Sequence, residues 1–250
     1  MTRSDRFVGK VCVVTAAGGG IGAAVAAGLE DEGAQVWRLD RRPCTDRGFI
    51  SCDVSSDAEV ASAREIIIAE TPTIHHLYNG VGMLPPRLGL RLEEEDVKEW
   101  QTVFDTNLHS MVRVLGAFAT SLSEDGSSSV VNMSSDQSLV PRGDALAYAA
   151  SKAAVNAFTI GLARQWIPRR IRVNAIAPGA VRSGFIDAVA KTAERRESMF
   201  AHAEATLPLG LGQPEAAAEL VRFLLSADAR NITGELFRAD SGQALMGIRL

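Results

Sequence analysis

The chain has 250 residues, of which 46% are hydrophobic, and a net charge of −4. This length and composition allow one full hydrophobic core, so we expect a single domain over residues 1–250. The acidic balance argues against the basic surface that nucleic-acid binding requires, and an odd count of 3 cysteines argues against a disulfide framework.

The N-terminal residues are polar and charged, and they contain no apolar stretch of the kind that directs secretion. The apolar runs elsewhere in the chain are too short to span a bilayer. We therefore expect a soluble cytoplasmic protein that acts on a small molecule, with no membrane, nucleic-acid or metal-ion partner.

Apolar, β-branched runs alternate with helical stretches along the whole chain. Strands are expected at 11–15, 35–40, 49–52, 74–79, 129–134, 171–176 and 235–238, and helices at 21–32, 57–70, 98–122, 147–167 and 215–226. Strands that are apolar throughout and alternate with helices predict a parallel sheet with helices on both faces. The expected fold class is therefore α/β, with a doubly wound parallel sheet of about seven strands.

A glycine-rich turn follows the first expected strand. Residues 16–22 read Ala-Ala-Gly-Gly-Gly-Ile-Gly and lead into an Ala-rich helix. Small residues let the backbone approach a pyrophosphate, and the helix N-terminus offers free N–H groups and a partial positive charge. The spacing differs from the G-x-G-x-x-G fingerprint, so a turn that binds no ligand is the alternative to a phosphate-binding loop.

Tyr148 and Lys152 lie four residues apart in the expected helix 147–167, so they project from one face. An ammonium group beside a phenol favours the phenolate, and we expect Lys152 to lower the pKa of Tyr148. A phenol tuned in this way exchanges a proton with an alcohol or carbonyl oxygen near neutral pH, while the Ser135 hydroxyl holds that oxygen. The alternative is a surface Tyr and Lys on an Ala-rich helix.

Taken together, these segments resemble the short-chain dehydrogenase/reductase family from about residue 7 to residue 245. The glycine turn matches the family pattern T-G-x-x-x-G-x-G, with Ala16 in place of the first glycine. Ser135, Tyr148 and Lys152 match three catalytic positions in order and spacing. The other matching segments, which depart from the family at Gly80, Val81, Ser183 and Ser241, are Asp53-Val54, Asn79-Gly80-Val81-Gly82, Asn107, 178–183, Ile232-Thr233-Gly234 and Asp240-Ser241-Gly242.

The resemblance implies a Rossmann-type fold and a role for each matched residue. Tyr148 is the acid/base, Lys152 contacts the nicotinamide ribose, and Ser135 orients the substrate oxygen. Asn107 holds a backbone kink and a water that passes protons outward. Residues 183–209 correspond to a mobile substrate lid. The cofactor-binding residues that the resemblance implies are Thr15, Gly18, Gly20, Ile21, Gly22, Asp40, Asp53, Val54, Asn79, Gly80, Tyr148, Lys152, Pro178, Gly179, Val181 and Ser183.

The choice of nicotinamide cofactor depends on the end of the second expected strand. Asp40 follows the glycine turn at close to the spacing of about 20 residues at which an acid meets the ribose 2′-hydroxyl of NAD. The same carboxylate repels the 2′-phosphate of NADP by up to roughly 4 kcal/mol. Arg41 and Arg42 favour the opposite choice, because an arginine accepts such a phosphate. NAD is the predicted cofactor, and NADP is the alternative.

These features predict an oxidoreductase that transfers a hydride between NAD(H) and a secondary alcohol or ketone. The segment from Ser135 to Gly143 also resembles that of 2,3-dihydro-2,3-dihydroxybenzoate dehydrogenases. In that case Arg142 or Arg182 meets a substrate carboxylate, and solvent-facing arginines are the alternative. The two remaining hypotheses are a catalytically silent dinucleotide-sensing protein and an epimerase without net redox chemistry.

The expected helices 98–122 and 147–167 carry more apolar residues than one sheet face needs. We therefore predict a homotetramer in which two copies of this helix pair form an isologous four-helix interface, and the family resemblance implies a second interface around residues 215–238. The alternative is that these residues face the monomer's own core. They are Val103, Phe104, Leu108, Met111, Leu115, Phe118, Ala153, Val155, Phe158, Ile160, Leu162 and Trp166.

Overall fold

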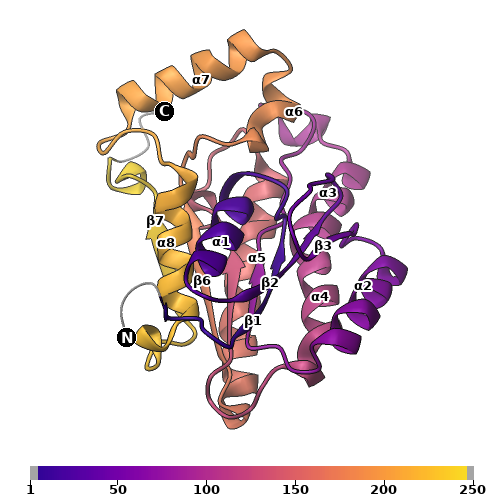
Figure 1. Ribbon diagram of the computed structural model, residues 1–250. Coiled ribbons are helices and arrows are strands. Elements are labelled where there is room, and N and C mark those ends of the chain that lie inside the picture. The colour runs from indigo at the N-terminus through magenta and orange to yellow at the C-terminus, as the bar shows by residue number, and fades with distance from the viewer. Residues whose placement is uncertain (1–4, 247–250) are drawn as a thin grey trace.

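A parallel sheet with helices on both faces forms the centre of the computed structural model, which describes residues 5–246 (Figure 1). Seven strands pair in the order β3-β2-β1-β4-β5-β6-β7 within the described residues, and every pairing is parallel. The predicted α/β fold is thus confirmed. The strands are β1 Val11–Thr15, β2 Gln35–Asp40, β3 Phe49–Ser51, β4 His76–Asn79, β5 Ser129–Met133, β6 Arg172–Pro178 and β7 Leu236–Ala239.

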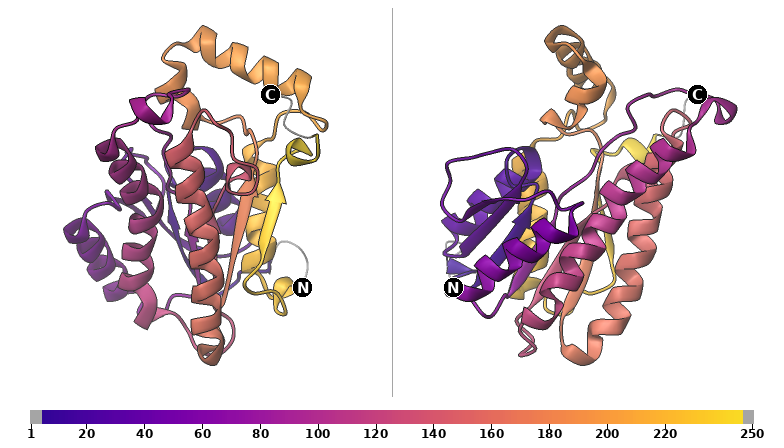
Figure 2. Two further views of the ribbon diagram at one scale, coloured as in Figure 1. Left: turned by 180° about the vertical axis from the view of Figure 1, so that it is seen from behind. Right: turned by 90° about the vertical axis from the view of Figure 1, so that its right-hand side faces the viewer.

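The helices form two layers (Figure 2). On one face of the sheet, α1 (Gly20–Asp31) packs against α8 (Pro214–Leu225). The other face carries α2, α3, α4 and α5. The bounds of the remaining helices are α2 Asp57–Glu70, α3 Val97–Phe104, α4 Ser110–Phe118, α5 Leu146–Trp166, α6 Asp187–Ala190 and α7 Ala193–Thr206. No helix within residues 5–246 is long and apolar enough to cross a membrane.

Strand β1 is apolar up to its last residue, Thr15, because both of its faces are buried. In β1, Val13 belongs to the cluster under α2, α4 and α5, whereas Cys12 and Val14 belong to the cluster under α1 and α8. All three residues are fully buried. Neighbouring strand residues point to opposite faces, so a doubly covered strand has no position where a polar side chain reaches water.

The helix predicted over 98–122 is not continuous. A π-helical turn, Asp105–His109, separates α3 from α4, and a 3₁₀ turn follows α4. Asn107 lies in the π-helical turn, fully buried, and its amide donates to Ser151 Oγ at 2.9 Å. Its Oδ1 accepts from the backbone N of Met83 at 2.7 Å. The expected backbone kink at Asn107 thus takes the form of a π turn, which frequently marks a functional site.

The strand order places a crevice at one edge of the sheet. The chain builds β1, β2 and β3 outward in one direction and then returns to place β4 on the other side of β1. In open α/β sheets, ligands bind beyond the carboxyl ends of the strands at such a reversal. The segment that contains α6 and α7 lies above this edge, at the top of Figure 1.

Candidate active site

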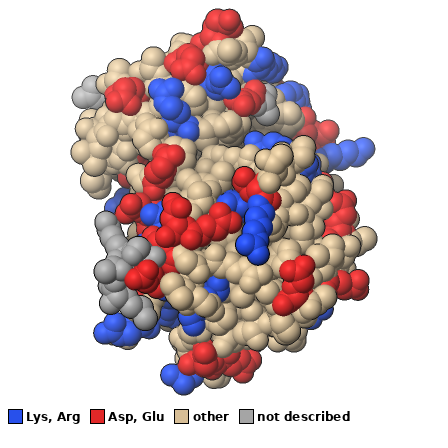
Figure 3. All heavy atoms as spheres, viewed as in Figure 1, with Lys and Arg blue, Asp and Glu red and all other residues tan. Residues whose placement is uncertain are grey.

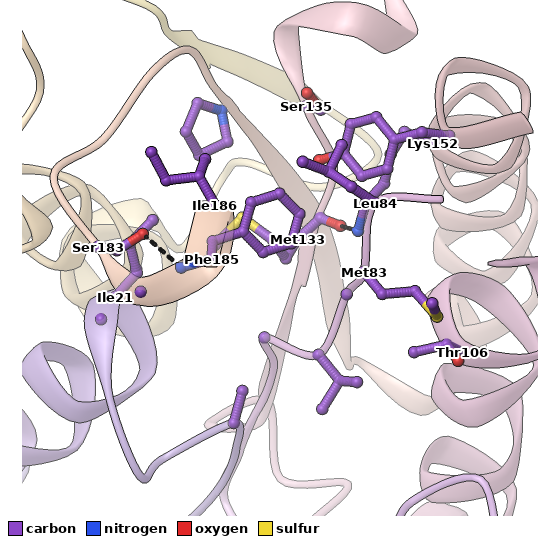
Figure 4. A pocket seen from close by; sticks show the side chains of 18 of the residues that line it. Ile21, Met83, Leu84, Thr106, Met133, Ser135, Lys152, Ser183, Phe185 and Ile186 are labelled. Carbon is purple, nitrogen blue, oxygen red and sulfur yellow. Dashed lines mark hydrogen bonds between the residues drawn. The ribbon is translucent and has the colours of Figure 1, made fainter. Parts of the chain in front are cut away.

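A cavity of about 1810 Å³ lies at the carboxyl edge of the sheet. Its wall includes residues that follow β1, β2, β3, β4, β5 and β6, together with residues of the 3₁₀ turn Gly184–Ile186 and of α7. Figure 4 shows Ile21 and Ser183 on one side of the cavity and Ser135 and Lys152 on the other. A pocket for one small ligand measures roughly 300–1,000 Å³, so this cavity is large enough for a dinucleotide and a substrate together.

The glycine turn after β1 accepts only small residues. A Cβ at Gly22 would lie 2.1 Å from the carbonyl oxygen of Ala16. Ala16 itself has φ 57°, in the left-handed region that glycine adopts most easily. The turn leads into the N-terminus of α1, which attracts anions. This backbone arrangement fits a pyrophosphate group.

Asp40 ends β2 beside the glycine turn and is 9% exposed. Its carboxylate accepts hydrogen bonds from the backbone N of Gly18 at 2.9 Å and of Arg42 at 2.8 Å. The Arg42 guanidinium lies 3.5 Å from the same carboxylate, and Arg41 pairs with Asp53 at 3.3 Å. Both arginines that would favour NADP are therefore already next to carboxylates.

The ends of the neighbouring strands complete this side of the cavity. Thr15 Oγ1 accepts from the backbone N of Gly80 at 2.9 Å and thereby ties the end of β1 to the end of β4. Asp53 accepts from both the backbone N and the hydroxyl of Ser55, at 2.9 and 2.6 Å. The Ser55 hydroxyl is the main group that holds the pKa of Asp53 below its usual value.

Most of the residues predicted for the site line the cavity. Four of them, namely Thr15, Gly18, Asn79 and Asn107, are absent from its lining. Asn79 donates to Asn132 at 2.9 Å, so it joins β4 to β5 rather than facing a ligand. The predicted residues that do line the cavity are Gly20, Ile21, Gly22, Asp40, Asp53, Val54, Gly80, Ser135, Tyr148, Lys152, Pro178, Gly179, Val181 and Ser183.

The three residues predicted for catalysis meet in this cavity and are all buried. Tyr148 and Lys152 lie on α5, and Ser135 follows β5 and caps the short turn Asp136–Ser138. Lys152 Nζ lies 5.9 Å from the centre of the Tyr148 ring and donates to the carbonyl oxygen of Met133 at 2.8 Å.

Burial dominates the protonation of this group. It raises the pKa of Tyr148 to about 12, against the opposing effects of a hydrogen bond with Ser135 and the positive charge of Arg142. It also lowers the pKa of Lys152 to about 7. The prediction that Lys152 lowers the pKa of Tyr148 is therefore wrong for this structure. Removal from water disfavours the phenolate and the ammonium alike.

The segment predicted as a lid covers the cavity from above. Ser183 Oγ accepts from the backbone N of Phe185 at 3.4 Å, and the Phe185 ring lies 5.9 Å from the Tyr148 ring. Both signs of charge occur at the top of Figure 3. Beside the lid segment, Arg182 pairs with Glu197 at 3.2 Å. Arg182 does not line the cavity, so the hypothesis that it meets a substrate carboxylate is not supported. Movement of residues 183–209 stays a prediction.

Several cavity residues carry no motif that sequence reasoning could use. Those on α7 belong to a charged helix without a clear apolar stripe, and nothing in the sequence shows which side faces a ligand. Asp136 and Gln137 follow Ser135 directly and lie in the segment from Ser135 to Gly143 that resembles the dihydrodiol dehydrogenases, but no role is predicted for either residue. The cavity residues that were not predicted include Trp100, Asp136, Gln137, Arg195, Met199 and His202.

Comparison with known proteins identifies the family. Residues 15–244 match the family described as Enoyl-(Acyl carrier protein) reductase. The chain is 32% identical to the short-chain reductase protein NovJ of Streptomyces niveus, over 94% of both chains. It is 30% identical to the 3-oxoacyl-(acyl-carrier-protein) reductase FabG of Thermotoga maritima, over 95% of this chain and 98% of that protein.

Among solved structures, the ligand-free aldohexose dehydrogenase of Thermoplasma acidophilum is similar, with a TM-score of 0.89 and 28% identity. The alignment covers 99% of this chain and 98% of that one. Fold, cavity and relatives together define a Rossmann-type oxidoreductase. The chain belongs to the short-chain dehydrogenase/reductase family.

Proposed function

We propose that this protein transfers a hydride reversibly between NAD(H) and a secondary alcohol or ketone, with Tyr148 as the acid/base. One observation carries the proposal. Ser135, Tyr148 and Lys152 line the same cavity as the glycine turn and Asp40, so a substrate oxygen and a dinucleotide have adjoining places.

When bound, the nicotinamide cofactor supplies or accepts the hydride. In reduction, the Tyr148 hydroxyl donates its proton to the carbonyl oxygen while the carbonyl carbon gains the hydride, and Ser135 holds that oxygen. In oxidation, the Tyr148 phenolate accepts the alcohol proton as the hydride leaves the carbon, so this direction first requires Tyr148 to lose its own proton. Because the pKa of Tyr148 is about 12, its proton is present at neutral pH and reduction needs no prior deprotonation.

The cavity residues fit NAD. Gly19, Gly20 and Gly22 line the cavity, and a side chain at Gly19 would meet Arg42 at 3.1 Å, so the turn requires the small residues that let a backbone approach a pyrophosphate. Asp40 keeps lone pairs for a ribose hydroxyl in addition to its two backbone contacts. We propose NAD as the cofactor because a 2′-phosphate would approach this buried carboxylate.

The named relatives act on different kinds of carbonyl and hydroxyl compounds, so they do not identify the substrate of this protein. NovJ and FabG are named as reductases, and the similar structure is named as an aldohexose dehydrogenase. A dihydrodiol dehydrogenase of the 2,3-dihydro-2,3-dihydroxybenzoate type is the second candidate. Arg142 favours it because Arg142 lines the cavity, and its one ion pair among the described residues is with Asp144 at 4.0 Å.

A cofactor assay tests the proposal. The purified protein is incubated with NADH or NADPH and a panel of ketones, and with NAD or NADP and a panel of secondary alcohols, sugars and cyclic diols. We expect oxidation or reduction of the cofactor with at least one compound. Cofactor binding without turnover of any compound would support the silent sensor, and isomerised product without cofactor consumption would support the epimerase.

We also propose a homotetramer, although fewer apolar residues are available for its interface than the sequence predicted. Seven of the predicted interface residues belong to the monomer's own core instead, namely Val103, Met111, Leu115, Phe118, Val155, Leu162 and Trp166. The outer surface of α3, α4 and α5 still exposes Val97 (71%), Val112 (44%) and Ile160 (56%). Light scattering after size exclusion should give a mass near four times 26.6 kDa, and a monomer would contradict the proposal.

A further inference from the structure

Two buried polar residues beside Ser135 have no role in the hydride transfer proposed above. Asp136 is 7% exposed and Gln137 is 3% exposed, and both line the cavity. Burying a carboxylate is costly unless hydrogen bonds or charges compensate it. The hydrogen bonds that these two side chains make, and those that they leave unmade, therefore indicate which groups a ligand should supply.

The protein satisfies only one oxygen of the Asp136 carboxylate. Oδ1 accepts from Ser135 Oγ at 2.9 Å and from the backbone N of Gln137 at 2.8 Å. Oδ2 accepts no hydrogen bond from the residues described, and the Gln137 side chain leaves its buried Oε1 without a partner as well. The nearby positive charge of Arg142 does not replace these contacts, because its side chain is 49% exposed and stays solvated. The wall next to Ser135 thus offers two acceptor oxygens, Asp136 Oδ2 and Gln137 Oε1, that no donor of the described residues satisfies.

The position of Asp136 indicates which donor belongs there. Ser135 holds the reacting oxygen in the function proposed above, and the Asp136 carboxylate lies one hydrogen-bond length from Ser135 Oγ. Two oxygens on neighbouring carbons are separated by about the same length. A hydroxyl on the carbon next to the reacting one would therefore reach Asp136 while the reacting oxygen stays on Ser135.

We propose that Asp136 determines specificity by accepting a hydrogen bond from a second hydroxyl group, so that the substrates are vicinal diols and the matching α-hydroxy ketones. The inference rests on the proposed function for the position of the reacting oxygen. Gln137 lies beside this contact and provides a further polar group for a polyhydroxylated substrate.

The test compares cyclohexanol with cis- and trans-1,2-cyclohexanediol as alternative substrates of the wild-type protein with NAD. We expect kcat/KM for the better diol to exceed that for cyclohexanol by about tenfold or more, the effect of one hydrogen bond to a charged group. In Asp136→Asn and Asp136→Leu this ratio should fall towards one. Asp144→Asn is the matched control on an exposed carboxylate and should keep the wild-type ratio.

The ratio separates specificity from a merely structural role. If Asp136 only positions Ser135, its substitution lowers kcat/KM for the diol and for cyclohexanol by the same factor. That result overturns the inference. It is also overturned if wild-type protein prefers cyclohexanol, or prefers 2-aminocyclohexanol to the diol. The wild-type comparison needs no variant, so a variant that fails to fold does not remove the test.

A binding measurement distinguishes failure of this inference from failure of the proposed function. Calorimetric titration of the protein–NAD complex with diol and with cyclohexanol reports the preference without turnover. A diol preference that Asp136→Leu removes, in a protein that turns over neither alcohol, supports the contact and contradicts the proposed function. Equal binding of the two alcohols overturns the inference, and turnover of either one then leaves the proposed function standing.

Discussion

In the proposed function the cavity has a cofactor half and a substrate half, and the two are built by different means. The cofactor half consists of backbone at the ends of β1, β2 and β4 and in the first turn of α1, where a Cβ at Gly22 would lie 2.1 Å from the carbonyl oxygen of Ala16. The substrate half consists of side chains from the turn after β5 and from α7, where Arg195 and His202 are exposed. A backbone-built site restricts its sequence tightly, whereas a side-chain-built site leaves its sequence free to set specificity.

Tyr148 lies where the two halves meet, so its loss should have the largest effect. Tyr148→Phe keeps the ring and its packing on Phe185 but removes the ionisable oxygen. We expect kcat to fall by about 10²–10⁴-fold, the usual contribution of a general acid. Cofactor affinity, measured by titration of NADH fluorescence, and thermal stability should stay close to wild type. Retention of more than a tenth of wild-type activity would show that another group transfers the proton.

Within the cofactor half, Asp40 provides the next largest effect. Asp40→Ser removes the carboxylate that would face a 2′-phosphate, so the ratio of kcat/KM for NADP to that for NAD should rise by tenfold or more, about 1.4 kcal/mol. Steady-state rates with both cofactors measure the ratio. Arg42→Ala is the informative companion, because it should weaken use of NADP and leave use of NAD nearly unchanged. A wild-type protein that already prefers NADP would contradict the assignment of Asp40 and favour Arg42 instead.

The same contrast explains what the sequence could predict. The predicted bounds of β1, β2 and α2 match the structure, since β1 is apolar and buried on both faces and Ser56 caps α2 through Glu59 N. The cofactor half was also predictable, because a tight backbone turn requires small residues at fixed positions. The direction of the Tyr148 pKa was not, since it depends on burial by segments distant in sequence. The break at Asn107 depends likewise on tertiary contacts, with Met83 and Ser151.

Lys152 belongs to a recognisable sequence motif, but its charge depends on burial, which the motif does not specify. Its pKa is lowered from 10.5 to about 7, so between these values the unfolded chain binds a proton that the folded protein has released. The free energy of unfolding therefore rises with pH across that range and loses this gain as the pH falls towards 7. Tyr148 acts in the opposite sense only above its unfolded pKa of 10. The lowered pKa values of His75 and His76 add a dependence of the same sign near pH 6, so a Lys152 variant must be compared with wild type at each pH.

Replacement of Lys152 by methionine should remove this pH dependence. Urea unfolding at pH 6 and pH 9 should show that Lys152→Met gains stability relative to wild type at the lower pH, by on the order of 2 kcal/mol. Lys98→Met on exposed α3 serves as the control and should show no such difference. Equal effects of Lys152→Met at both pH values would show that the amine keeps an ordinary pKa in the folded protein.

The smallest expected effect concerns Ala16, a residue with a Cβ at a position in the glycine turn whose backbone conformation favours glycine. Ala16 occupies a left-handed conformation, φ 57°, which costs a residue with a Cβ about 1–2 kcal/mol. Glycine relieves this strain but makes the unfolded chain more flexible, at about 0.4–1 kcal/mol. Ala16→Gly should therefore stabilise the protein by roughly 0.5–1 kcal/mol, measured by urea unfolding. Gly22→Ala provides the opposite control, because its Cβ would meet the Ala16 carbonyl at 2.1 Å and should destabilise the fold strongly. If Ala16→Gly proved destabilising, the Ala16 methyl would contribute more through packing than its backbone conformation costs, and the cofactor half would depend on side chains as the substrate half does.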